Sequence, residues 1–156
     1  MSRWNRVFPR QVDNTYRGYK AALWIFGLVV LMKLAISLGS IFNGHEAASS
    51  ADGIPLDTYT PAGARTVVTL FALLGLANVV ICVVCVVVLF RYRAMVPFLF
   101  ALLLLQQLGR KLVLDFLPIA RTGTPTGSVI NLVLLGLMIV GLALSLRGRA
   151  DLQAQE

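Results

Sequence analysis

Four long apolar segments, separated by short polar stretches, dominate the pattern of the chain. They cover residues 21–42, 66–90, 95–117 and 129–146. A helix that crosses the hydrocarbon core of a bilayer needs about 20 predominantly apolar residues. The runs do not alternate between apolar and polar positions, as strands of a membrane barrel would. The pattern therefore predicts an all-α integral membrane protein, an antiparallel bundle of four transmembrane helices forming a single domain over residues 1–156.

The composition points the same way. Hydrophobic residues make up 58% of the chain, charged residues only 13%, and the mean hydropathy is +0.80. A soluble domain is typically about 45–50% apolar and about 25% charged. A water-soluble fold is therefore excluded, and the four segments leave little chain for a separate soluble domain.

The positive charges are unevenly distributed. The chain has 14 Lys and Arg against 7 Asp and Glu. One predicted side of the membrane carries Arg3, Arg6, Arg10, Arg17, Lys20, Arg91, Arg93, Arg147 and Arg149, whereas the other side carries only Arg65 and Arg121. The positive-inside rule then predicts that both termini are cytoplasmic, in the inner (plasma) membrane of a cell. Because topology explains this charge, we expect no nucleic-acid partner.

The segments between the spans carry recognisable local signals. Residues 1–20 are basic and aromatic, which favours an anchor in the membrane interface. Asp13 is the expected N-cap of the first helix. We expect 21–42 to be an uncleaved span rather than a signal peptide. Thr60-Pro61 predicts the start of the second helix, roughly 50 Å before Arg93, so this helix should tilt or protrude. Thr124-Pro125 or Ser128 should cap the fourth helix, and the turn signal Asp52-Gly53 falls in the long outer loop.

The third span has an unusually polar second half. Its apolar stretch 94–105 is too short to cross the bilayer, so Gln106 and the residues that follow it lie at membrane depth. Four of these side chains share one helix face by their spacing: Gln107, Arg110, Lys111 and Asp115. The apolar residues favour insertion by roughly 4–8 kcal/mol, and the three charges oppose it by up to roughly 8–10 kcal/mol at the bilayer centre. The polar face should therefore turn into the bundle or into an aqueous cavity.

The other spans supply polar residues at a similar depth. Lys33 and Ser37 share a face of the first span, Asn78 lies in the second, and Asn131 begins the fourth. If these faces converge, they form a polar pocket in the outer half of the bilayer, in which three cations (Lys33, Arg110, Lys111) accompany one carboxylate, Asp115. We expect this pocket to bind an anionic lipid or an acidic group of a partner.

Two alternatives compete with the pocket. Arg110 and Lys111 can extend to the outer surface, with Lys111 and Asp115 forming an ion pair within the helix. The third helix can also break near Gly109, which would leave residues 110–117 in the plane of the interface.

The remaining motifs carry little chemistry. Cys82 and Cys85 form a CxxC, but its apolar surroundings favour a packing role over thiol redox chemistry. The only His, His45, makes a metal or haem site unexpected. Gly141 and Ser145 allow close helix approach, within the chain or between copies.

We therefore expect a non-enzymatic accessory or assembly subunit with no catalytic residue, no metal and no cofactor. Its expected partners are membrane lipids, and a second integral membrane subunit or further copies of the chain. A small oligomeric transporter or channel is the alternative function, and a thiol redox protein using Cys82 and Cys85 is a less favoured one. The spans show no internal repeat of the kind many transporters contain.

Overall fold

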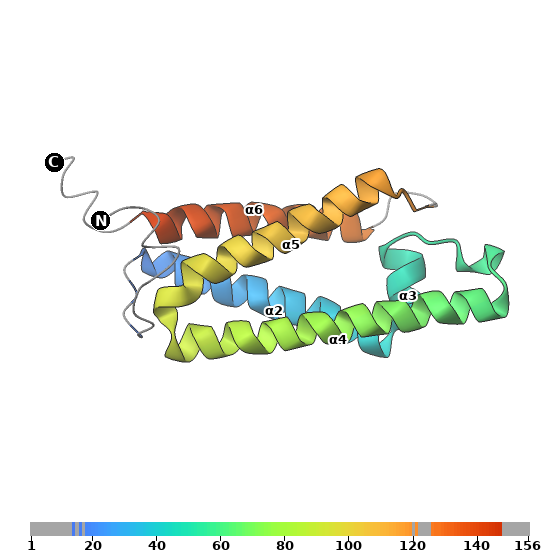
Figure 1. The fold of residues 1–156 in the computed structure, drawn as a ribbon, viewed down its shortest axis with the longest axis horizontal. Helices are drawn as coiled ribbons and strands as arrows, with labels where there is room; N and C mark the ends of the chain where they lie inside the picture. Colours follow the sequence, from blue (N-terminus) through green and yellow to red (C-terminus); the bar gives the residue numbers. More distant parts are fainter. Residues whose placement is uncertain (1–13, 15, 17, 120, 122–125, 148–156) are drawn as a thin grey trace.

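The computed structural model describes residues 14, 16, 18–119, 121 and 126–147. Four long helices run along the long dimension of the molecule (Figure 1). They are α2 (Lys20–Phe42), α4 (Pro61–Arg91), α5 (Val96–Phe116) and α6 (Thr126–Leu146). All four are long and apolar enough to cross a membrane, α5 together with the short helix η3 (Arg93–Met95) that precedes it. These features indicate a multi-pass membrane protein.

The helix limits agree with the sequence analysis to within a few residues. Thr60 caps α4, since its hydroxyl accepts a hydrogen bond from Gly63 N at 3.2 Å, and Pro61 occupies the first helical turn. The predicted start of the second helix is therefore confirmed. Helix α5 continues without a break through Gly109, so the alternative with residues 110–117 in the interface plane is wrong. The Asp13 and Thr124-Pro125 caps, and most of the basic segment 1–20, lie outside the described residues.

A folded loop joins α2 to α4. It contains α3 (Gly44–Glu46), the π-helical turn η1 (Ala47–Ala51) and the 3₁₀ turn η2 (Leu56–Thr58). Its buried residues Ala48, Ile54 and Leu56 pack against the side chains of Val67, Val68 and Phe71. At 31 residues α4 is about 46 Å long, which exceeds the roughly 30 Å hydrocarbon core. The loop thus covers the part of α4 that the sequence analysis expects to protrude or tilt.

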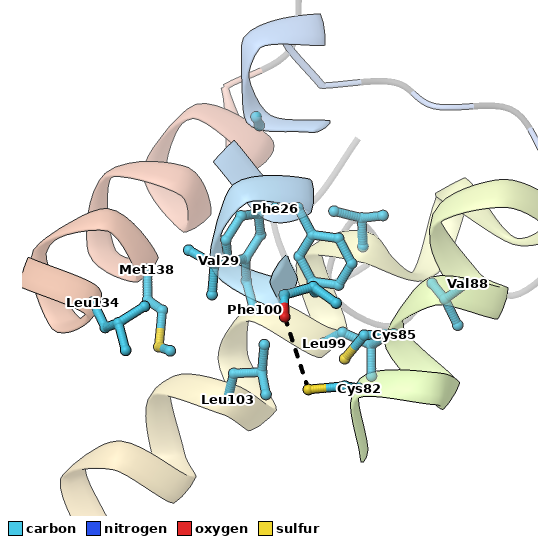
Figure 2. Packing of buried hydrophobic residues seen from close by; sticks show 13 residues of the cluster. Phe26, Val29, Cys82, Cys85, Val88, Leu99, Phe100, Leu103, Leu134 and Met138 are labelled. Carbon is cyan, nitrogen blue, oxygen red and sulfur yellow. Dashed lines mark hydrogen bonds between the residues drawn. The ribbon is translucent and has the colours of Figure 1, made fainter. Parts of the chain in front are cut away.

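The apolar core lies toward the end of the molecule where α2 begins and α6 ends (Figure 1). All four long helices contribute to it: Phe26 and Val29 from α2, Cys82, Cys85 and Val88 from α4, Leu99, Phe100 and Leu103 from α5, and Leu134 and Met138 from α6 (Figure 2). The rings of Phe26 and Phe100 meet edge to face, with centroids 5.0 Å apart, a geometry that aromatic pairs prefer. This half of the molecule therefore has a continuous apolar interior.

Small residues bring the helices into close contact. A Cβ on Gly75 would lie 2.8 Å from the carbonyl oxygen of Ser37, where α4 crosses α2. A Cβ on Gly141 would collide with the ring of Phe100. Close approach at small residues is a main source of helix association in membranes. The small pair that includes Gly141 is thus used inside the chain.

We predict that Gly75→Ala destabilises the fold by about 1–3 kcal/mol, because the added methyl group meets backbone that can move only with α2. Gly136→Ala is the matched control, since a Cβ at Gly136 has no neighbour within 4 Å. Unfolding in detergent micelles titrated with dodecyl sulfate measures both variants. Equal stability of the two would contradict the close crossing at Gly75.

Candidate functional site

Polar side chains from all four long helices lie just beyond the apolar core. We call these residues the polar layer: Lys33, Ser37, Asn78, Gln106, Gln107, Arg110 and Asn131. Gln106 Nε2 donates to Asn78 Oδ1 at 2.9 Å, which joins α5 to α4. Gln107 Nε2 donates to Asn131 Oδ1 at 3.1 Å, which joins α5 to α6. Neighbouring residues of one helix therefore reach the helices on either side.

The amide network leaves one acceptor without a donor. Asn78 Nδ2 donates to the carbonyl oxygen of Leu74 at 2.9 Å, so both ends of its amide group are used. Gln106 Oε1 is buried and has no hydrogen-bond partner among the described residues. A buried acceptor without a partner is costly. The layer therefore retains capacity to accept a hydrogen bond.

Lys33 is the most unusual member of the polar layer. Its side chain is only 9% exposed. Among the described residues, no hydrogen bond or ion pair reaches its ammonium group. The Ser37 hydroxyl does not serve it, because that hydroxyl donates to the carbonyl oxygen of Lys33 at 2.6 Å. Arg110 lies near enough for the two positive charges to repel one another, and the thiols of Cys82 and Cys85 are also close. Lys33 is thus a buried cation whose charged neighbour has the same sign.

Arg110 forms an ion pair with Asp52, which the sequence does not predict as a site residue. Its Nη2 lies 3.1 Å from Asp52 Oδ2 and 3.4 Å from Oδ1. The side chain of Arg110 is 46% exposed and that of Asp52 20% exposed. Asp52 comes from the loop between α2 and α4, 58 positions away in the sequence. The expectation that Asp115 is the carboxylate of this site is therefore corrected, since Asp52 pairs with Arg110.

Two predicted site residues lie apart from the polar layer. Lys111 and Asp115 are exposed on α5. Within the described part of the chain no ion pair joins them, so the predicted pair within the helix is not formed. Of the predicted site residues, Lys33 lies near Arg110, Asn78 bonds Gln106, and Gln107 bonds Asn131. The structure leaves the outermost charges of α5 on the surface.

The sequence predicts Asp52 only as part of a turn. The turn is real, because Gly53 has a φ of 72°, which favours glycine. The signal that could have found Asp52 was the excess of cations in the second half of the third span, together with the acidic residues of the long loop between the first two spans. Charges at membrane depth need a partner, and that loop supplies one.

The two thiols belong to the apolar core. Cys85 is fully buried and Cys82 is 2% exposed. Cys82 Sγ donates a weak hydrogen bond to Val30 O at 3.9 Å (Figure 2). Enclosed thiols of this kind cannot meet a redox partner in solution. In the described residues, no three His, Cys, Asp or Glu side chains gather where a metal ion could bind.

No protein-family model, no curated protein and no solved structure matches this chain.

We predict that Asn78 and Gln106 are energetically coupled. A double-mutant cycle with Asn78→Leu and Gln106→Leu should give a coupling energy of about 0.6 kcal/mol, and at most about 1.7 kcal/mol, as for other hydrogen bonds between membrane helices. Unfolding in mixed micelles provides the free energies.

The control cycle combines Asn78→Leu with Gln107→Leu. Asn78 bonds Gln106, whereas Gln107 bonds Asn131. The effects of Asn78→Leu and Gln107→Leu on the free energy of unfolding should therefore add. Equal coupling in both cycles would contradict the separate pairings of Gln106 and Gln107.

Proposed function

We propose that the chain is an antiparallel bundle of four transmembrane helices in the inner (plasma) membrane, with both termini in the cytoplasm. The uneven distribution of Lys and Arg supports this orientation. Tyr19 N, just before α2, donates to Leu144 O near the end of α6 at 3.4 Å, which is consistent with both termini on one side. In this orientation the apolar core lies in the cytoplasmic half of the bilayer, and the polar layer lies in the outer half.

We further propose that the protein is a non-enzymatic accessory or assembly subunit whose polar layer binds the headgroup of an anionic lipid. The burial of Lys33 without a counter-ion carries this proposal. An unpaired charge at membrane depth costs several kcal/mol by insertion scales, roughly 2.5–3.5 kcal/mol at the helix centre. An anion that reaches both Lys33 and Arg110 would remove that cost.

A lipid headgroup fits this position better than the acidic side chain of a partner subunit. Lys33 is only 9% exposed, so little of its side chain is open to contact with a helix of a second subunit. A small headgroup could enter from the side, past the second half of α5. That half is exposed to the surroundings, with Leu112 57% and Phe116 76% exposed. The route leads from the outer leaflet to the polar layer.

The transporter alternative lacks support of this kind. A transport path has to continue across the bilayer, and the polar layer is followed by the apolar core. A site without such a continuation suits binding or assembly better than passage.

We predict that Lys33→Met and Arg110→Gln each weaken the binding of anionic lipid about tenfold or more, because each removes a charged hydrogen-bond donor. The measurement is native mass spectrometry of the full chain, released from phosphatidylcholine nanodiscs containing phosphatidic acid or phosphatidylglycerol. Arg121→Gln is the matched control, since Arg121 is an exposed cation beyond the end of α5, and it should leave binding unchanged.

Failure of the wild-type chain to retain either anionic lipid in preference to phosphatidylcholine would overturn the proposed function. Equal losses in all three variants would show a general attraction between charges rather than a site, and would overturn it as well.

A second prediction separates the assembly role from transport. The double variant Lys33→Ala, Arg110→Ala should lose any integral membrane subunit that co-purifies with the wild-type chain. Retention of the subunit, combined with loss of solute flux in reconstituted vesicles, would instead favour the transporter. An acidic partner subunit becomes the better proposal if the subunit binds in the absence of anionic lipid.

A further inference from the structure

The carboxylate of Asp52 is held in place by a loop with its own anchor. Asp52 N donates to Ala47 O at 3.1 Å and Ile54 N donates to Ala48 O at 2.9 Å, so the backbone on both sides of Asp52 is fixed. The apolar residues of the loop are buried against α4. The Asp52 side chain projects from this anchored loop to Arg110 on α5. The ion pair is thus an attachment between a folded loop and the rim of the polar layer.

A second contact places Asp52 against the beginning of α6. A Cβ on Gly127 would lie 2.7 Å from Ala51 O and 3.2 Å from Asp52 Oδ1. Gly127 is in the first turn of α6, where the helix dipole favours a negative charge. The carboxylate therefore lies between the guanidinium of Arg110 and the positive end of a long helix. Such an environment suits any compact anion, including a phosphate.

The charges of this region do not balance. The two cations are Lys33 and Arg110. Asp52 supplies one negative charge, and it forms an ion pair with Arg110 only. Phosphate monoesters carry about −1.5 to −2 charges at neutral pH and have three strong acceptor oxygens. One such group has enough acceptor oxygens for two cations, whereas the Asp52 carboxylate pairs with Arg110 and with no other cation of the described residues.

We propose that Asp52 occupies the position of a phosphate monoester, and that the headgroup of such a lipid displaces it from Arg110. This inference rests on the proposed function and adds its ligand class and its control. Displacement is feasible because Arg110 is nearly half exposed, and ion pairs of that kind contribute little to stability. After displacement the phosphate bridges Arg110 and Lys33, Asp52 turns to the water, and the loop segment 47–54 loses its attachment to α5. Lipid binding and release of the loop are therefore one event.

The first test measures competition. Asp52→Asn should strengthen the binding of phosphatidic acid in phosphatidylcholine nanodiscs about two- to fivefold, because the competing carboxylate is lost. Asp57→Asn is the matched control, since Asp57 is an exposed carboxylate in the same loop, and it should change nothing. Phosphatidylglycerol, a phosphodiester with one negative charge, should bind more weakly than phosphatidic acid. Inorganic phosphate distinguishes the sources, and binding as tight as that of phosphatidic acid would overturn the lipid as the ligand.

The second test measures the loop itself. Phosphatidic acid should increase amide hydrogen exchange in segment 47–54 of the wild-type chain. In Asp52→Asn the exchange should be high from the start and should not change with the lipid.

The outcomes separate this inference from the proposed function. If Asp52→Asn binds phosphatidic acid no more tightly than the wild type, and the lipid does not change hydrogen exchange in segment 47–54 of the wild type, the displacement of Asp52 is overturned. The anion site still stands in that case if Lys33→Met and Arg110→Gln lose binding. If Asp52→Asn does not fold, as shown by its thermal unfolding midpoint, hydrogen exchange of the wild-type chain decides alone: unchanged exchange in segment 47–54 when phosphatidic acid binds overturns the displacement.

Discussion

A charge inside a bilayer must find a partner, and this constraint organises the half of the molecule that holds the polar layer. Arg110 lies on a helix that would be only marginally stable in lipid by itself, and its counter-ion comes from a loop 58 positions away in the sequence. The loop can supply Asp52 because Ala48, Ile54 and Leu56 fix it to α4. The fold of a water-exposed segment is thus tied to the charge of a membrane helix. Lys33 is subject to the same constraint, and within the described residues its charge is left unmatched.

The two halves of the molecule are held together by different interactions. In the half where α2 begins and α6 ends, the helices meet through aromatic and aliphatic side chains around Phe26 and Phe100, with Gly141 allowing close approach. This packing does not depend on any charge. In the other half the contacts are hydrogen bonds between amides and one ion pair, which are more readily exchanged. A rigid apolar half can hold the helices together while the polar half changes partners.

The sequence predicted most of the fold and part of the site. Length and hydropathy located the four long helices, and the Thr60-Pro61 signal located the start of α4, because both depend on local interactions. The spacing of the polar residues along α5, at intervals of three and four, correctly pointed to Arg110. It was misleading for Lys111 and Asp115, because spacing within a helix does not show which face is covered by neighbours. The pairing of Arg110 with Asp52 depends on how the loop folds over α4, and no periodicity reports such a distant contact. The pairings of Gln106 and Gln107 with two different helices were inaccessible for the same reason.

The uneven apolarity of the helices has a consequence for biosynthesis. The most apolar window of α4 has a mean hydropathy of 3.0, whereas that of α5 reaches only 1.4. α2 and α4 leave the ribosome first and share the largest helix contact of the molecule. When α5 follows, a hairpin that already presents Asn78, and a loop that already presents Asp52, can receive its polar side chains. Helix α4 and the loop before it thus hold groups that pair with polar side chains of α5, so part of the cost of placing α5 in a membrane is offset by chain that is synthesised before it.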